Sequence, residues 1–150
     1  MRIQYPATVS CDEDGRYLVK FYDFGWGCTD GETIEEALGE AADCLDELIA
    51  TTIENDEVLP VPGDMLAVNT FPVSPSALIA AKAAIYNEHK AKRHKKTELA
   101  ALVGKNEKFI RTLLDPNAGS KIQSIEEVLH ALGKRLVISV EDDIVTRHRV

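Results

Sequence analysis

Residues 95–114 hold a small residue, a glycine and two aliphatic residues at the spacing that two steeply crossing helices require. Ala100 is small enough for close contact between helices, and Gly104, four residues later, can adopt the positive φ of a tight turn. Ile110 and Leu113 follow Gly104 by six and nine residues, so they would share the buried side of a second helix. This pattern predicts a helix-turn-helix, whose second helix reads DNA in the major groove.

The side chains left outside this predicted motif suit the phosphates and base edges of DNA. Arg111 and Lys108 can reach base edges, and Arg is best suited to guanine. Asn106 can cap the second helix, whose free amides would face a phosphate. Glu107 could accept a hydrogen bond from cytosine or only favour the helix N-terminus, and the same basic residues could also form a solvated helix face. The predicted DNA-binding residues are Lys96, Thr97, Lys105, Asn106, Glu107, Lys108, Arg111, Thr112 and Lys121.

The net charge of −8 over 150 residues opposes binding to DNA, but the charge is divided unevenly along the chain. Residues 1–75 contain 16 acidic and 3 basic residues, a net charge of −13, whereas residues 76–150 contain 9 acidic and 14 basic residues, a net charge of +5. The asymmetry indicates two modules with different partners. The basic half suits a polyanion, and the acidic half suits a cationic protein or provides solubility.

The acidic half has the pattern of a small α+β layer. Alternating residues predict strands at 3–10 and 17–22 joined by a turn, and a short third strand at 26–29. Thr33 and Glu36 form a capping box ahead of an amphipathic helix that ends near residue 55. A β-like stretch at 66–73 completes the order β-β-β-α-β.

The basic half has the pattern of a helical domain. A helix starts at Ser74-Pro75, and further helices are expected at about 97–103, 106–114 and 124–132, the last with a capping box at 124–127 and Gly133 at its end. Residues 135–140 then alternate as a short strand. Because a lone strand needs a partner, we expect the same strand of a second copy to pair with it. The predicted dimerisation residues are Leu136, Ile138 and Val140.

The cysteines and the hydropathy place this chain in a reducing, aqueous compartment. Cys11, Cys28 and Cys44 are far apart and odd in number, which favours free thiols in the cytoplasm. No run of about 18 apolar residues predicts a membrane span, and residues 1–6 lack the apolar stretch of a signal peptide. All four histidines lie in the other half from the cysteines, so we expect neither a metal nor a cofactor.

Several motifs resemble those of the HicB antitoxins, the DNA-binding halves of bacterial HicA–HicB toxin–antitoxin pairs. The most specific is Thr-x-Gly-x-Thr-x-x-Glu-Ala at residues 29–37, and Tyr5-Pro6, Gly15-Arg16-Tyr17 and Asp23 precede it. The second half is similar to the subgroup with a Cro/repressor-like helix-turn-helix. The chain departs from the family at residues 23–27, where many members have Pro-Gly, and at Lys95-Lys96, where Thr-Gln is frequent. In the second half of the chain, the segments that match this subgroup are 98–100, 104–105, 121–122 and 131–134.

The resemblance implies a fold and a function for each half. Residues 1–73 would form a partial ribonuclease-H-like domain without working catalytic acids, which binds a small basic mRNA-cleaving toxin of the HicA type. Residues 74–145 would bind operator DNA and dimerise, so that the protein, as a homodimer or tetramer, represses its own promoter. Trp26 could instead belong to the core. The residues expected to contact the toxin are Tyr22, Asp23, Phe24, Trp26, Asp30 and Glu32.

Two other functions fit parts of the sequence. Asp12, Asp14, Asp23 and Asp30 could serve a metal-dependent nuclease if they converged within a few ångströms. Alternatively, the protein could be a stand-alone repressor whose N-terminal half senses a small molecule. The first alternative would make the protein an enzyme, whereas the antitoxin hypothesis predicts that it is not one.

Overall fold

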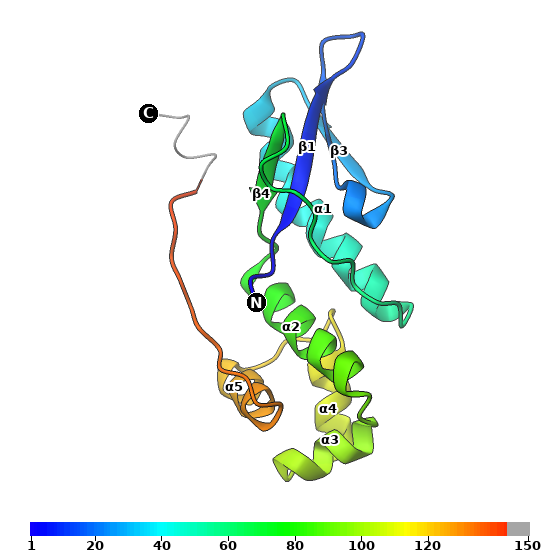
Figure 1. Ribbon diagram of the computed structural model, residues 1–150, viewed down its shortest axis with the longest axis vertical. Helices are drawn as coiled ribbons and strands as arrows, with labels where there is room; N and C mark the ends of the chain where they lie inside the picture. The colour runs from blue at the N-terminus through cyan, green and yellow to red at the C-terminus, as the bar shows by residue number, and fades with distance from the viewer. Residues whose placement is uncertain (144–150) are drawn as a thin grey trace. The chain divides into compact units, whose positions relative to one another are not determined.

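The computed structural model describes residues 1–143, except for the side chain of Cys28. It divides into two compact units. The first, here called the sheet unit, comprises residues 2–48, 60–76 and 139–143. The second, the helical unit, comprises Met1 with residues 49–59 and 77–138 (Figure 1). The predicted domain end at residue 145 and the predicted thiol of Cys28 lie outside the described part. Cys11 is an exposed free thiol.

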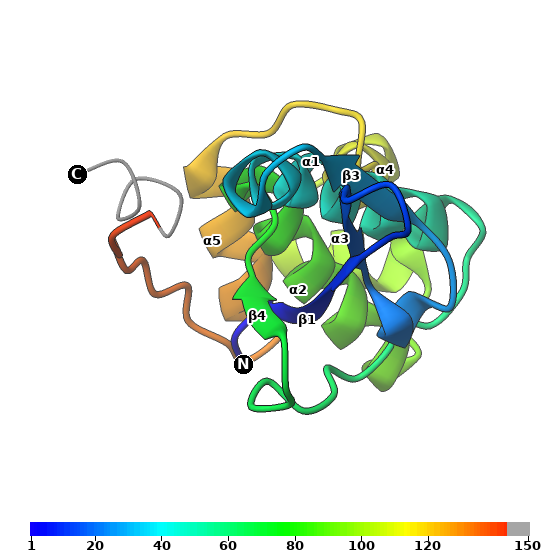
Figure 2. The same cartoon turned by 90° about the horizontal axis from the view of Figure 1, so that it is seen from above.

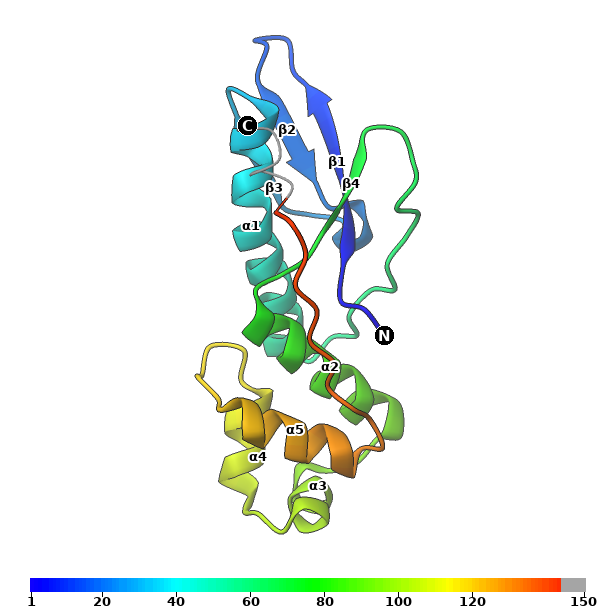
Figure 3. The ribbon, with the colours of Figure 1, turned by 90° about the vertical axis from the view of Figure 1, so that its left-hand side faces the viewer.

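An antiparallel sheet of four strands forms the sheet unit. The strands are β1 (Tyr5–Cys11), β2 (Tyr17–Lys20), β3 (Cys28–Gly31) and β4 (Thr70–Val73), in the spatial order β3-β2-β1-β4. Figures 1 and 2 show β4 beside β1, and Figure 3 labels all four strands. Val9 lies opposite Val19, and Ala7 lies opposite Phe71. Because side chains alternate along a strand, Ala7, Val9 and Val19 fall on one face, and all three are buried.

The helix α1 (Ile34–Glu54) lies along one face of this sheet (Figure 3). Ala37, Ala41 and Leu45 are fully buried, as the helical spacing predicted. The Thr33 hydroxyl accepts a hydrogen bond from the amide of Glu36 at 3.1 Å, as expected of the capping box. The carboxylate of Glu36 accepts from the amide of Glu32 at 2.9 Å, one residue earlier than the expected partner.

All four strands are shorter than predicted or shifted along the chain: β1 spans 5–11 instead of 3–10, and β3 spans 28–31 instead of 26–29. The fourth strand was expected from residue 66, but β4 begins at Thr70 because Asn69 adopts φ +56° and turns the chain just before it. The second strand ends at Lys20, and a 3₁₀ turn, η1 (Tyr22–Phe24), follows. The order β-β-β-α-β and the α+β class are confirmed.

The helical unit contains α2 (Ala77–Lys92), α3 (Lys96–Val103), α4 (Glu107–Leu114) and α5 (Ile122–Ala131). Figure 3 shows α3 and α4 joined by a short turn, with α5 beside them. Its core is one cluster to which each of these helices contributes, including Ile85, Leu99, Ile110 and Val128. No helix in residues 1–143 is long and apolar enough to cross a membrane.

The expected capping box at residues 124–127 is wrong. The helix α5 begins two residues earlier, at Ile122, so Ser124 lies inside its first turn and its amide donates to the carbonyl of Lys121 at 3.1 Å. Ile125, Val128 and Leu129 are buried in the helix that starts at Ile122. Burial of these residues therefore does not require the helix to start at residue 124. Gly133 follows the helix at φ +78°, which confirms its predicted place at the C-terminus.

The predicted strand at residues 135–140 does not form in the single chain. These residues pair with no strand among the described residues, and the four-stranded sheet does not include them. Leu136 packs against the helical core, whereas Ile138 and Val140 are 68% and 95% exposed. A strand that needs a second copy as its partner cannot form in one copy, so dimerisation through Leu136, Ile138 and Val140 stays a prediction.

Candidate functional site

The helices α3 and α4 are joined by a short turn at residues 104–106, where the sequence predicted the two helices of a helix-turn-helix. Leu99 and Ala100 of α3 and Ile110 and Leu113 of α4 are all buried, none more than 4% exposed. Gly104 adopts φ +66° in the turn between the two helices, where a Cβ would meet open space but the backbone would be strained. The four positions that suggested the motif therefore carry out the structural roles that the sequence predicted for them.

Backbone hydrogen bonds fix the path of the turn. The amide of Gly104 donates to the carbonyl of Ala101 at 3.2 Å, and the amide of Lys105 donates to the carbonyl of Ala100 at 2.9 Å. These two bonds form a Schellman motif, which satisfies carbonyls that the end of α3 would otherwise leave free. The turn then leads directly into α4, because Asn106 accepts a hydrogen bond from the amide of Phe109 at 2.8 Å and caps that helix as predicted.

The outer face of α4 is polar. Lys108, Arg111 and Thr112 are exposed, while Glu107 is half-buried. The guanidinium of Arg111 forms an ion pair with the carboxylate of Glu107, with 2.6 Å between Nη2 and Oε1. Sequence reasoning missed this pair, although a separation of four residues along a helix is the signal for it. Glu107 thus holds Arg111 on the exposed face of α4.

The remaining predicted DNA-binding residues surround α4 on two sides. Asn106, Lys108, Thr112 and Lys121 line a groove of about 420 Å³ beside α4. Lys96, Thr97 and Glu107 line a second hollow on the α3 side. Lys105 is exposed in the turn, with its ammonium 5.6 Å from the ring centre of Phe109.

The residues expected to contact a protein partner all lie in the sheet unit, but in different surroundings. Tyr22 and Trp26 are 67% and 53% exposed, so Trp26 does not belong to the core. Phe24 packs on Tyr5, with 4.8 Å between the ring centres. The carboxylate of Asp23 accepts a hydrogen bond from the amide of Gly63 at 3.0 Å, which ties η1 to the loop before β4.

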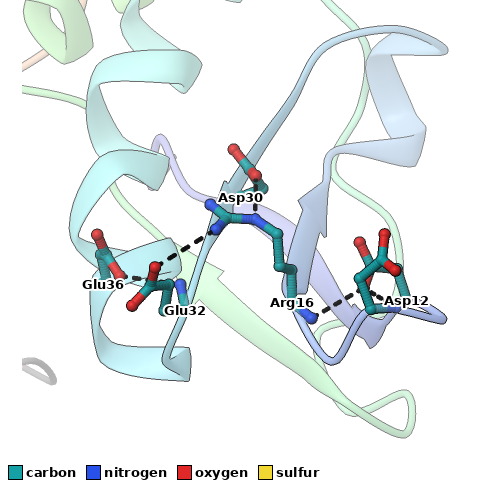
Figure 4. Close-up of polar contacts among 6 residues, drawn as sticks. Asp12, Arg16, Asp30, Glu32 and Glu36 are labelled. Atoms are coloured by element: carbon teal, nitrogen blue, oxygen red, sulfur yellow. Dashed lines mark hydrogen bonds and ion pairs between the residues drawn. The ribbon is translucent and has the colours of Figure 1, made fainter.

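Asp30 and Glu32 both face Arg16 (Figure 4). The distance from Arg16 Nε to Asp30 Oδ2 is 2.8 Å, and that from Nη1 to Glu32 Oε1 is 3.8 Å. The register of β2 and β3, in which Tyr17 lies opposite Gly31, brings these residues together. The hydrogen bond and the negative charge of Asp30 raise the pKa of Arg16. A cationic partner that approached Asp30 and Glu32 would therefore meet two carboxylates that are already paired with Arg16.

The four aspartates of the nuclease alternative do not converge. Asp12 accepts hydrogen bonds from the amides of Asp14 and Arg16, which shapes the turn between β1 and β2. Asp23 and Asp30 are held by Gly63 and Arg16, as described above. Within residues 1–143, no three carboxylates, imidazoles or thiols are close enough to hold a metal ion. The two-metal chemistry that this alternative requires has no site in the described residues.

Residues 4–84 match the family model for the HicB-like antitoxin of bacterial toxin–antitoxin systems. Antitoxin HicB of Escherichia coli K12 is 30% identical over 134 residues, which cover 89% of this chain and 96% of that protein. Antitoxin HicB 2 of Photorhabdus laumondii is 34% identical over 134 residues, which cover 89% of this chain and 94% of that protein.

A solved toxin–antitoxin complex from Streptococcus pneumoniae aligns with 45% of this chain and 49% of its own, at 39% identity and a TM-score of 0.39. The family match covers more than half of the chain, and the sequence relatives extend it through most of both units. The chain therefore belongs to the HicB-like antitoxins of bacterial toxin–antitoxin systems, a family of regulatory proteins rather than enzymes.

Proposed function

We propose that this antitoxin neutralises a HicA-type toxin, a small basic ribonuclease that cleaves mRNA, and represses its own operon through α3 and α4. Toxin binding is assigned to residues 1–73, and DNA binding and dimerisation to residues 74–145. Both activities would take place in the cytoplasm. The observation that carries the proposal is the exposed cationic face of α4, formed on a helix whose opposite side is fully buried.

The charges around α4 support DNA as the ligand of the helical unit. Arg111 is exposed and held by Glu107, which keeps its guanidinium in place for a guanine base. Lys96, Lys105 and Lys121 are also exposed, at the start of α3, in the turn and at the start of α5. Lysines at these places can bind phosphates on either side of α4 and fix its register on the duplex.

The sheet unit supports a protein partner. Tyr22 and Trp26 expose large aromatic surfaces, which are enriched at the energetic centres of protein interfaces. Most of the sheet unit lies within residues 1–75, whose net charge of −13 attracts a cationic protein and accelerates its association. A toxin that binds RNA must have a basic surface, so the sheet unit would compete with RNA for it.

The segment after α5, residues 135–140, supports repression by a dimer. Ile138 and Val140 are exposed apolar side chains, and their segment pairs with no strand among residues 1–143. Pairing of residues 135–140 between two copies would cover them and hold two α4 helices together. Such a dimer would read two half-sites about one helical turn of DNA apart.

The toxin-binding proposal is tested by co-expression with the small basic protein encoded next to the antitoxin, followed by purification in high salt. We expect the wild-type antitoxin to retain that protein. Replacing both Tyr22 and Trp26 with Ser should weaken the complex by about 2 kcal/mol or more, because exposed aromatic residues at an interface often contribute this much. Leu102→Ser, which changes an exposed apolar residue on α3, serves as the matched control. Equal retention by the aromatic variant and the control would contradict the assigned surface.

A further inference from the structure

A hollow of about 760 Å³ lies in the helical unit, where α2 ends and α3 begins. The last turn of α1, the end of α2, the first turn of α3 and both ends of α4 contribute to its walls. Ile53, Tyr86 and Leu114 supply apolar surface. The proposed function uses only Lys96, Thr97 and Glu107 from this lining and leaves the rest without a role.

The acidic residues of the hollow already have partners. Asp56 forms an ion pair with Lys90, with 2.6 Å between Oδ1 and Nζ. Glu107 is paired with Arg111, and Glu54 accepts a hydrogen bond from the side-chain amide of Asn117. The basic residues differ, since Arg93, Lys95 and Lys96 form no side-chain ion pair with another described residue. With Lys90, the lining contains four cations against the three carboxylates of Glu54, Asp56 and Glu107, an excess of one positive charge with the histidines neutral.

Arg93 occupies a position that the backbone makes unfavourable for it. It follows the last residue of α2 at φ +54°, and its amide donates to the carbonyl of Lys90 at 3.3 Å. Glycine adopts this left-handed conformation without steric cost, whereas an arginine does not. An arginine at a position that glycine fits best points to a role for its guanidinium.

Two histidines of the hollow also have unused hydrogen-bonding capacity. Nδ1 of His89 and Nδ1 of His94 are shielded from solvent and have no hydrogen-bond partner in the described residues. Burial lowers the pKa of His89, and the positive charges of Lys96, His94 and Lys90 lower it further. Lys96 and His89 also contribute to lowering the pKa of Asp56, after the hydrogen bond and charge of Lys90. Lys90 and Lys96 therefore place positive charge beside both His89 and Asp56.

We propose that this hollow, the Arg93 pocket, binds a phosphate group through Arg93, Lys95 and Lys96. Guanidinium and ammonium groups form their strongest hydrogen bonds with phosphate oxygens, and the two imidazoles lie beside them in the same pocket. The phosphate belongs either to a free small molecule, whose organic part the apolar surface would accept, or to the backbone of bound DNA. The second source rests on the proposed function.

The test is a calorimetric titration of the full chain with inorganic pyrophosphate, together with NMR of the histidine side chains. We expect binding that shifts the signals of His89 and His94. Arg93→Gly should weaken binding by about tenfold or more, and Lys96→Ala should weaken it as well. Lys20→Ala is the matched control, since it removes one exposed positive charge from β2 and should leave the affinity unchanged.

Arg93→Gly also separates a binding role from a structural one. Relief of the left-handed strain should raise the melting temperature by about 2 to 4 °C while the affinity for pyrophosphate falls. No binding by the wild type at millimolar pyrophosphate would overturn the proposal. So would an equal loss of affinity in Lys20→Ala and Arg93→Gly, because the attraction would then be non-specific.

Promoter DNA distinguishes the two sources of the phosphate. If pyrophosphate competes with promoter DNA and Arg93→Gly weakens the binding of both, the pocket takes a backbone phosphate. If DNA binding is unaffected while pyrophosphate binding is lost, the pocket takes a free ligand. A wild-type protein that binds pyrophosphate but no promoter DNA would refute the repressor proposal and leave the pocket assigned to a free ligand.

Discussion

Lys82 is a charged residue at the centre of the helical unit and holds the end of α4. Its side chain is fully buried, and its ammonium donates to the carbonyls of Thr112 and Asp115 at 2.9 and 2.5 Å. The C-terminus of a helix carries partial negative charge, so this is a favourable place for a cation. Burial nevertheless lowers the pKa of Lys82. The lysine thus links α2 to the C-terminal end of α4.

Replacing Lys82 should destabilise the helical unit. Lys82→Ala should lower the free energy of unfolding by about 2 to 4 kcal/mol, because it leaves a cavity and removes two charge-assisted hydrogen bonds. Lys82→Met should cost less, since the methionine keeps most of the packing of the stem. Urea unfolding measures both changes, with the exposed Lys20→Ala as control. An effect of Lys82→Ala below about 0.5 kcal/mol, typical of a surface substitution, would show that the contact is not needed.

Tyr5 gives the sheet unit a pH dependence. Its ring is 2% exposed and its hydroxyl donates to the carbonyl of Pro60 at 2.8 Å. Burial, with a smaller effect of Asp23, raises the pKa of Tyr5 to about 12, above the value of about 10 in an unfolded chain. Between these values the unfolded chain loses the proton first, so the stability that Tyr5 contributes is complete below about pH 10 and is lost towards pH 12.

Tyr5→Phe should therefore reduce the loss of stability at alkaline pH. Urea unfolding at several pH values from about 9 to 12 measures this loss. The comparison with the wild type isolates Tyr5, because Tyr86, whose pKa burial also raises, is present in both proteins. An identical slope of stability against pH in the two proteins would contradict the assignment.

At the scale of elements, the turn between α3 and α4 depends on one glycine. Gly104→Ala should destabilise the protein by about 1 kcal/mol, because alanine does not readily adopt φ +66°. Gly39→Ala provides a matched comparison, since Gly39 lies inside α1 and an added Cβ there meets nothing within 4 Å. That substitution should instead stabilise the protein by about 0.5 to 1 kcal/mol. Thermal unfolding measures both changes, and equal signs for the two would refute this description of the turn.

Elements defined by local chemistry could be predicted from the sequence. Gly104, the cap at Asn106 and the cap at Thr33 depend on a few neighbouring residues, and all three are present in the structure. The start of α5 could not be predicted in this way, because Ser124 has the residue type of a cap but lies within the helix. The late start of β4 depends on the left-handed conformation of Asn69. An asparagine can adopt this conformation but does not have to, so its presence in the sequence does not predict the turn.

Contacts between distant segments could not be predicted at all. Arg16 meets Asp30 because β2 and β3 pair in one particular register, and Asp23 meets Gly63 across 40 residues. The exposure of Trp26 likewise depends on the path of a whole loop. The sequence alone therefore did not decide whether Trp26 lies in the core or on the surface. The residues predicted to bind DNA lie within 26 consecutive residues, from Lys96 to Lys121, so the helices and the turn that carry them could be predicted from local patterns. Their contacts with DNA stay a prediction.

At the scale of the whole molecule, the chain joins a strongly acidic unit to a basic one. The net charge of −8 therefore describes neither unit. An acidic unit would reduce the affinity for DNA by repulsion at low salt, and a bound basic toxin would remove that repulsion. This arrangement would let the promoter respond to the amount of toxin that the antitoxin holds.

The most direct test of the account is a titration of labelled promoter duplex with the full protein, followed by fluorescence anisotropy. Arg111→Ala should weaken binding by about 1 to 3 kcal/mol and relax the preference at one base pair of each half-site. Its unfolding free energy should change by no more than about 0.5 kcal/mol, because the pair with Glu107 is exposed. Lys20→Ala, with the same change in charge, should bind as the wild type does. Unchanged affinity and base preference in Arg111→Ala would contradict the assignment of α4 as the helix that reads DNA.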